Sequence, residues 1–331
     1  MRNVSVICPT YNEEKYISNC IESVLAQDYP KEKIEIIFVD GGSNDRTREL
    51  IEGYQKKHDN IKLLDNSEKI VPYAMNKGIK EANGDIIIRI DAHSSYPKNY
   101  VKILVDNLIK LNADNVGAVC LTQVLNKTNK ALAIKEVLSH RFGVGNSLFR
   151  TGVDNIQEAD TVPFGCFRKD VFSRFGYYDE RLARNQDIEL NKRIKSGGGK
   201  IFLIPDTTCT YYARENYKAL AKNNYQNGLW NILTVFYTKN FKSLSIRHFI
   251  PLAFILSILV PILFVTIDIL FVGLGLLSLS FYLIVMSIIS IRVSISKELN
   301  FLNVLIAFIT LHFSYGIGSL MGLIKLPFIK S

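Results

Sequence analysis

The chain has 331 residues, with 40 lysines and arginines against 31 acidic residues and a net charge of +9. This length fits one large domain with an appendage, or two modest domains. Asp268 is the only charged residue between Phe249 and Ile291, and none lies between Leu299 and Ile324. The composition therefore excludes a uniformly soluble chain and indicates a basic front part followed by an apolar tail.

In the front part, short apolar runs alternate with stretches of helical periodicity. We expect strands at Val4–Pro9, Ile34–Val39, Ile61–Leu64 and Asp85–Ile90, and helices at Tyr16–Leu25, Asp45–His58 and Tyr73–Ala82. This alternation predicts an α/β fold with a mostly parallel sheet covered on both faces. Ligands bind such sheets at the carboxyl ends of the strands, so the polar residues there are the candidates for function.

Two polar clusters follow the first two strands. The first contains Thr10 and Glu13, and the second begins with Asp40, directly before two glycines. Each has a structural interpretation, a helix cap for the first cluster and a turn acid for the second. Asp40 also puts a carboxylate at the ligand edge of the sheet.

Asp91 and His93 follow the fourth strand, two residues apart. A carboxylate and an imidazole at this spacing can approach one cation, and Mn²⁺ accepts both oxygen and imidazole ligands. Arg89 is a candidate partner of Asp91 or of a phosphate, and a lone Asp-x-His also occurs without a metal.

Asp187 stands in the first turn of a predicted helix that stops at Gly197–Gly199. An acid at this position can simply complement the helix dipole. It can also remove a proton from a bound hydroxyl.

Taken together, these clusters resemble family-2 inverting glycosyltransferases with the GT-A fold, a Rossmann-like nucleotide-diphospho-sugar transferase fold. The resemblance is closest to exopolysaccharide glucosyltransferases of the succinoglycan chain-elongating type. It covers about Val4 to Trp230 and rests on CPTYNEE, VDGGSNDRT, the Asn76-Lys77-Gly78 region, DAHSSYP, PFGCFRKDVF and GYYDERLARNQDIELNKRI, in that order.

The resemblance implies a role for individual residues. It assigns nucleotide binding to Pro9, Thr10, Tyr11, Glu13, Asp40, Gly42, Ser43, Lys77 and Asp91. It assigns a divalent cation, Mn²⁺ or Mg²⁺, to Asp91 and His93, and the catalytic base to Asp187. On the acceptor side it places Gly165, Cys166, Gln186 and Trp230.

The resemblance implies transfer of a hexose, with UDP-glucose as the expected donor, to a lipid-linked or polysaccharide hydroxyl. The Gln-x-x-Arg-Trp signature of processive members is changed here, because Leu229 precedes Trp230. This favours addition of one sugar at a time over a processive synthase. A non-catalytic membrane scaffold that keeps the sugar-nucleotide fold is also compatible with the sequence. A nicotinamide-dependent oxidoreductase would need GxGxxG after the first strand, and this chain has Thr-Tyr-Asn-Glu there.

We expect a cytoplasmic catalytic domain at residues 1–240 and a membrane region at 241–331. Two or three transmembrane helices are predicted, at about 249–267, 269–291 and 301–324, because about 20 apolar residues cross a bilayer. The N-terminus shows no signal-peptide pattern, and the cations before the first span fit a multi-pass protein of the cell (inner) membrane with its front domain inside. Three crossings would put Lys325 and Lys330 outside, against that rule.

Membrane lipid is therefore an expected partner, nucleic acid is not, and a homo-oligomer is compatible with the sequence. The cysteines are odd in number and show no CxxC spacing, so we expect reduced core residues at Cys8, Cys20, Cys120, Cys166 and Cys209.

Overall fold

The computed structural model describes residues 1–329 and divides the chain into two compact units. The first unit comprises residues 1–121 and 148–212, and the second comprises residues 122–147 and the chain from 213 onward. This division differs from the expected boundary at 240. Residues 122–147 and 213–240 group with the C-terminal helices because their helices bury their apolar faces against those helices.

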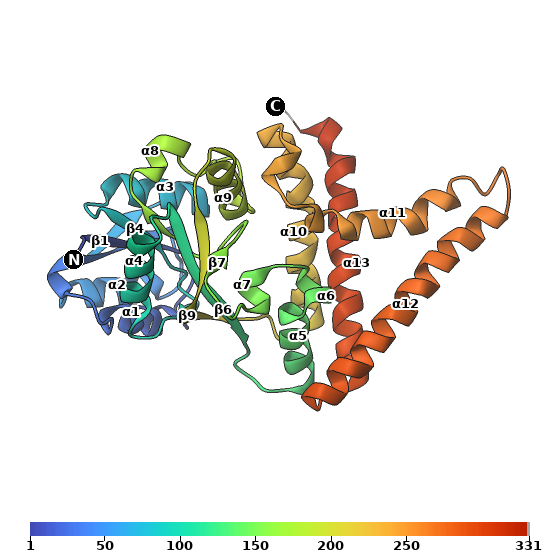
Figure 1. Ribbon diagram of the computed structural model, residues 1–331, viewed down its shortest axis with the longest axis horizontal. Helices are drawn as coiled ribbons and strands as arrows, with labels where there is room; N and C mark the ends of the chain where they lie inside the picture. Colours follow the sequence, from blue (N-terminus) through green and yellow to red (C-terminus); the bar gives the residue numbers. More distant parts are fainter. Residues whose placement is uncertain (330–331) are drawn as a thin grey trace. The chain divides into compact units, whose positions relative to one another are not determined.

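The first unit is built on a nine-stranded sheet in the order β3-β2-β1-β4-β8-β6-β9-β5, with β7 paired to β9 (Figure 1). The strands are β1 (Val4–Thr10), β2 (Ile34–Asp40), β3 (Ile61–Asp65), β4 (Ile86–Arg89), β5 (Ser94–Ser95), β6 (Asn115–Gln123), β7 (Gln157–Glu158), β8 (Cys166–Arg168) and β9 (Ile201–Tyr212). The first four strands run parallel, and β8 is antiparallel to β4 and β6. The expected α/β architecture is confirmed, with an antiparallel extension.

Helices cover both faces of this sheet, so its strands are apolar on both sides. The helices of the first unit are α1 (Ile17–Leu25), α2 (Thr47–Gln55), α3 (Val71–Glu81), α4 (Tyr100–Lys110), α7 (Leu148–Thr151), α8 (Val171–Phe175) and α9 (Gln186–Ser196), with a 3₁₀ turn η1 (Lys31–Lys33). One core contains side chains of α1, α2 and α4, and the other contains side chains of α3, α8 and α9. All five cysteines are buried and unpaired in disulfides.

The second unit is helical. Its helices are α5 (Asn129–Ser139), α6 (Arg141–Val144), α10 (Tyr217–Thr238), α11 (Ile250–Ile262), α12 (Leu270–Lys297) and α13 (Phe301–Lys325), with the 3₁₀ turns η2 (Phe241–Ser243), η3 (Ile246–His248) and η4 (Leu326–Phe328). Within residues 1–329, two helices are long and apolar enough to cross a membrane, α12 and the helix from Phe301 to Phe328.

The first predicted span, at 249–267, is not one continuous helix. α11 ends at Ile262, one residue after Pro261, which lies inside its last turn and supplies no backbone N–H. Its 13 residues give about 20 Å of helix, less than the roughly 30 Å of a hydrocarbon core. α12 in turn continues past 291 and ends at Lys297, where Glu298 adopts the left-handed conformation with φ 54°.

Candidate active site

A cavity lies at the carboxyl edge of the sheet in the first unit. The strand register explains its composition, because Thr10 at the end of β1 pairs with Asp40 at the end of β2, and Arg89 of β4 lies beside β1 on the other side. The cavity is lined by Pro9, Thr10, Tyr11, Glu13, Val39, Gly41, Asn66, Lys69, Ile70, Val71, Ala74, Arg89, Asp91, Ala92 and His93. The sheet thus brings together the polar clusters that follow β1, β2 and β4.

Asp40 anchors the turn after β2. Its buried carboxylate accepts the backbone N–H groups of Gly42 and Ser43 at 3.2 and 3.1 Å, and the hydroxyl of Ser43 at 2.6 Å. Gly42 has φ 77°, a conformation that glycine adopts without steric cost. Arg48 lies 3.7 Å from the same carboxylate. Asp40 therefore shapes the loop at the cavity wall, and its charge is already engaged by local donors.

Thr10 presents a buried hydroxyl that has no hydrogen-bond partner among residues 1–329. A buried polar atom without a partner is costly unless a ligand or water satisfies it. Its neighbour Tyr11 is exposed and lies against Gly41. The end of β1 is therefore suited to hold a ligand that offers a hydrogen-bonding group.

Asp91 and His93 lie just past β4, as predicted. The backbone N–H of Asp91 donates to the Tyr96 hydroxyl at 2.9 Å, which fixes the turn. His93 Nδ1 lies 3.0 Å from Glu13 Oε1, and its ring contacts the ring of Tyr211 edge-on. The imidazole is therefore oriented by a carboxylate of the first cluster, an arrangement typical of metal-binding histidines.

Arg89 joins two of the predicted site carboxylates. Its side chain is 6% exposed, its Nη1 contacts Asp187, and its Nη2 donates to Asp91 Oδ1 at 3.1 Å. Its Nε has no hydrogen-bond partner in the described part of the chain. Asp91 or a phosphate was the predicted partner of Arg89, and the contact with Asp187 was not predicted.

Asp187 stands at the beginning of α9, directly after Asn185 and Gln186. Asn185 has φ 62°, so the chain turns sharply into the helix. The Asp187 side chain keeps about a third of its surface exposed, which leaves it reachable for a hydroxyl group. Burial raises the pKa of Asp187, and the charge of Arg89 works in the opposite direction. A higher pKa makes an ionised carboxylate a stronger base.

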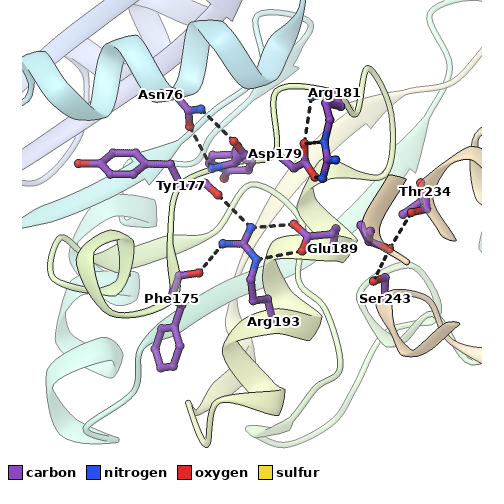
Figure 2. Close-up of polar contacts among 11 residues, drawn as sticks. Asn76, Phe175, Tyr177, Asp179, Arg181, Glu189, Arg193, Thr234 and Ser243 are labelled. Atoms are coloured by element: carbon purple, nitrogen blue, oxygen red, sulfur yellow. Dashed lines mark hydrogen bonds and ion pairs between the residues drawn. The ribbon is translucent and has the colours of Figure 1, made fainter. Parts of the chain in front are cut away.

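The loop before α9 is held from two sides (Figure 2). Asn76 of α3 donates to the carbonyl of Tyr178 at 2.9 Å and accepts its N–H at 3.0 Å. Arg193 of α9 donates to the carbonyls of Phe175 and Tyr177, and its Nη2 lies 2.7 Å from Glu189 Oε2. Burial raises the pKa of Tyr178, which sits near Arg89 and Asp187. This loop therefore packs a neutral phenol beside the candidate base.

Several predicted residues lie away from the cavity lining. Lys77 donates to the carbonyl of Asp65 at 2.7 Å. Gly165 has φ 36°, and its carbonyl accepts the N–H of Arg89, so it supports β4. Cys166 is fully buried in β8, where burial raises the pKa of its thiol. Gln186 is buried at the start of α9, and Trp230 belongs to α10 in the second unit.

The cavity also includes residues that the sequence analysis missed. Asn66, Lys69, Ile70, Val71 and Ala74 come from the connection between β3 and α3 and from the start of α3. The position of this connection after a predicted parallel strand indicates the ligand edge of the sheet. Its residues form no acidic or aromatic cluster, so no site was predicted there.

The donor set fits a divalent cation only in part. Asp91 offers oxygen and His93 nitrogen, a combination that suits Mn²⁺ better than Mg²⁺. Within residues 1–329, no group of three or more His, Cys, Asp or Glu side chains could hold a metal ion. A cation here would therefore need further ligands, which the oxygens of a bound diphosphate and water can supply.

The sheet, with its cavity at the carboxyl edge and Asp91 and His93 after β4, has the GT-A-type sugar-nucleotide transferase fold. The profile of glycosyl transferase family 2 matches residues 5–176. The chain belongs to this family and is a glycosyltransferase of glycan synthesis.

Similar proteins include two curated relatives. Over 233 residues the chain is 32% identical to the dolichyl N-acetyl-alpha-D-glucosaminyl phosphate 3-beta-D-2,3-diacetamido-2,3-dideoxy-beta-D-glucuronosyltransferase of Methanococcus voltae, covering 69% of this chain and 72% of that protein. Over 211 residues it is 31% identical to the succinoglycan biosynthesis protein ExoA of Rhizobium meliloti, covering 63% of this chain and 63% of that protein.

Among solved structures, the chain resembles the mannosyltransferase PcManGT of Pyrobaculum calidifontis, in complex with GDP-Man and Mn²⁺. The TM-score is 0.62 at 15% identity, covering 96% of this chain and 87% of that one. It also resembles Staphylococcus aureus TarS in complex with UDP-GlcNAc, with a TM-score of 0.55 at 17% identity, covering 96% and 90%. At these identities the likeness concerns the fold.

Proposed function

We propose that this chain is an inverting hexosyltransferase that moves a sugar from a nucleotide-diphosphate donor, with UDP-glucose expected, to a hydroxyl of a lipid-linked acceptor. The observation that carries the proposal is the convergence of Asp187 and Asp91 on Arg89 beside the cavity. This convergence supports Asp187 as the base, on the proposal that the donor diphosphate binds beside Asp91.

Different residues in and beside the cavity have different proposed roles. The turn anchored by Asp40 and the hydroxyl of Thr10 bind the nucleotide, while Asp91 and His93 hold the divalent cation. When bound, that cation offsets the negative charge on the leaving diphosphate. Asp187 accepts the proton of the acceptor hydroxyl while the oxygen attacks the anomeric carbon, opposite the diphosphate, so the configuration inverts.

The acceptor and the location follow from the apolar helices. α12 exposes many apolar side chains, a surface that favours membrane association, with the catalytic unit on the cytoplasmic face. The Methanococcus voltae relative carries a dolichyl-linked sugar phosphate in its name, which supports a lipid-linked acceptor here. The changed sequence before Trp230 favours transfer of a single sugar.

The test is a donor screen with detergent-solubilised protein and Mn²⁺ or Mg²⁺, following release of nucleoside diphosphate with and without a lipid-linked acceptor. Asp187→Asn should lower kcat about 10²–10⁴-fold, the contribution typical of a general base. Asp170→Asn, which changes an exposed aspartate of an ion pair beside α8, is the matched control. Full activity of Asp187→Asn would exclude the base role, and activity without any cation would exclude the role given to Asp91 and His93.

A further inference from the structure

α13 packs along other helices of its own unit. It runs along α10 in the same direction, because Tyr217 bonds to Asn303 at 2.8 Å near the start and Ile232 lies against Gly322 near the end. A Cβ at Gly318 would clash with the backbone carbonyl of Tyr225 in α10. α13 therefore lies alongside α10 over most of its length, so the two helices would have to enter a bilayer together.

α10 is poorly suited to hydrocarbon. Lys218 and Lys222 are exposed on its first turns. Its middle carries a run of amide side chains, namely Asn223, Asn224, Gln226, Asn227 and Asn231. Asn224 and Asn231 are buried against protein, but inserting the pair α10 and α13 would take the two lysines and the partly exposed Asn223, Gln226 and Asn227 into lipid, where ionisable and amide groups are expensive.

The first half of α13 also lies beside charged segments. Val137 of α5 shares a core with α13, and α5 carries an ion pair between Lys135 and Glu136. His312 Nε2 lies 2.8 Å from the carbonyl oxygen of Phe142 in α6. Residues 313–324 remain, which is about 18 Å of helix and too short for a hydrocarbon core of roughly 30 Å.

α11 and the first half of α12 behave differently. They pair as an antiparallel hairpin, with the rings of Phe254 and Tyr282 stacked at 4.3 Å and the hydroxyls of Ser257 and Ser278 2.7 Å apart. The tip of this hairpin exposes six large apolar side chains, with Thr266 and Asp268 exposed at the turn among them; the six are Leu263, Phe264, Val265, Ile267, Ile269 and Leu270. A surface of this kind needs an apolar solvent to cover it.

We propose that the hairpin of α11 and α12 is the membrane-embedded element, and that α13 stays outside the hydrocarbon. The hairpin enters the bilayer and returns, so residues 239–248, residues 292–300 and Lys325 all face the same side. This topology rests on the membrane association proposed above and adds to it which helices insert.

The charges around the hairpin agree with this topology. Lys239 and Lys242 precede α11, Arg292 and Lys297 close α12, and Lys325 ends α13. With one hairpin inserted, all of them lie on one face, as the preference of cations for the cytoplasmic side requires. Three crossings would place Lys325 on the opposite face.

Single cysteines introduced by Lys242→Cys, Ser296→Cys and Lys325→Cys test the topology, because all three positions are exposed and the five native cysteines are buried. Sealed inside-out and right-side-out vesicles are treated with a membrane-impermeant polyethylene-glycol maleimide, and the mass shift is read on a gel. We expect all three variants to be labelled in the same vesicle orientation. Labelling of Lys325→Cys only in the orientation that protects Ser296→Cys would overturn the proposal.

A matched pair of lysine substitutions tests the position of α13 independently. Leu302 of α13 and Leu277 of the hairpin are similarly exposed, at 60% and 66%. Leu302→Lys should leave membrane retention unchanged, while Leu277→Lys should lower it several-fold in an alkaline carbonate wash. Equal loss in both variants would overturn the exclusion of α13. If the unmodified chain itself leaves the membrane in carbonate, the membrane association fails and the hairpin topology fails with it. If the unmodified chain stays in the membrane but Ser296→Cys and Lys325→Cys are labelled in opposite vesicle orientations, the hairpin topology is wrong while the membrane association stands.

Discussion

Replacing Arg89 by glutamine should move the acid limb of the pH–rate profile to higher pH. In the proposed mechanism Asp187 must be ionised to act as the base, and burial raises its pKa while the charge of Arg89 lowers it. Removing the charge leaves burial and the nearby charge of Asp91, and both raise the pKa. A larger fraction of Asp187 is then protonated at any given pH, and the rate falls first on the acid side.

The size of this shift follows from the contact and its exposure. Two unit charges about 4 Å apart interact by about 4 kcal/mol at an effective dielectric of 20, and by about 1 kcal/mol in bulk water. Arg89 is buried and the Asp187 side chain is about a third exposed, so the pair lies between these limits. An interaction of this size is large enough to move the acid limb measurably to higher pH when the charge of Arg89 is removed.

The assay measures nucleoside diphosphate release across the pH range. Mn²⁺ is kept saturating so that a change in metal affinity at Asp91 does not alter the measured rate. Arg89→Lys keeps the charge and should keep most of the acid limb in place. Because losing the guanidinium of Arg89 leaves the Asp91 and Asp187 carboxylates without their shared ion-pair partner and can lower stability, the circular dichroism and thermal unfolding of both variants are measured first. An Arg89→Gln enzyme that is folded and has an unshifted acid limb would refute the reasoning.

Three further changes test other parts of the site. Asn76→Ala removes both hydrogen bonds to Tyr178, so we expect about 2–3 kcal/mol less unfolding free energy in denaturant titrations, with lower kcat; an unchanged midpoint would contradict the support assigned to this loop. Asp40→Ala frees the turn after β2 and should raise the donor KM about tenfold or more with little change in kcat, measured by initial rates. His93→Ala should raise the Mn²⁺ concentration for half-maximal activity about 10–100-fold in a metal titration, whereas an unchanged titration would remove His93 from the metal site.

The sheet and most of its ligand edge were predictable because they depend on local patterns. Apolar runs of strand length end in polar clusters, and parallel strands carry those clusters to one edge, where Asp40 and Asp91 lie. Only chain order and periodicity are needed for that inference. The family resemblance then supplied roles that no single cluster could define.

The pairing of Arg89 with Asp187 was not predictable in the same way. The two residues are 98 positions apart, and their contact depends on how the loop before α9 is folded. That loop is held in part by hydrogen bonds of Asn76 and Arg193 with backbone groups of Tyr177 and Tyr178, and such contacts leave no trace in sequence periodicity. The roles of the individual site residues stay predictions.

The structural division of the chain differs from the predicted boundary for a related reason. The predicted boundary at 240 placed α10 in the catalytic domain, whereas the structure groups it with the C-terminal helices. Its apolar positions and Gly228 instead match α13, and a Cβ at Gly228 would clash with the backbone carbonyl of Tyr315. A close helix contact of this kind depends on small residues far apart in the chain, so hydropathy alone did not reveal it.

The close contact between α10 and α13 bears on how a water-soluble form of this enzyme is engineered. Truncation at residue 240 would strip α10 of its partner and expose the helix face around Gly228, so the shortened polypeptide would be prone to aggregate. The hairpin offers a better cut, because the hydroxyls of Ser257 and Ser278 are only 2.7 Å apart. Joining the chain there with a short polar turn would delete the apolar tip of the hairpin and leave α13 packed against α10.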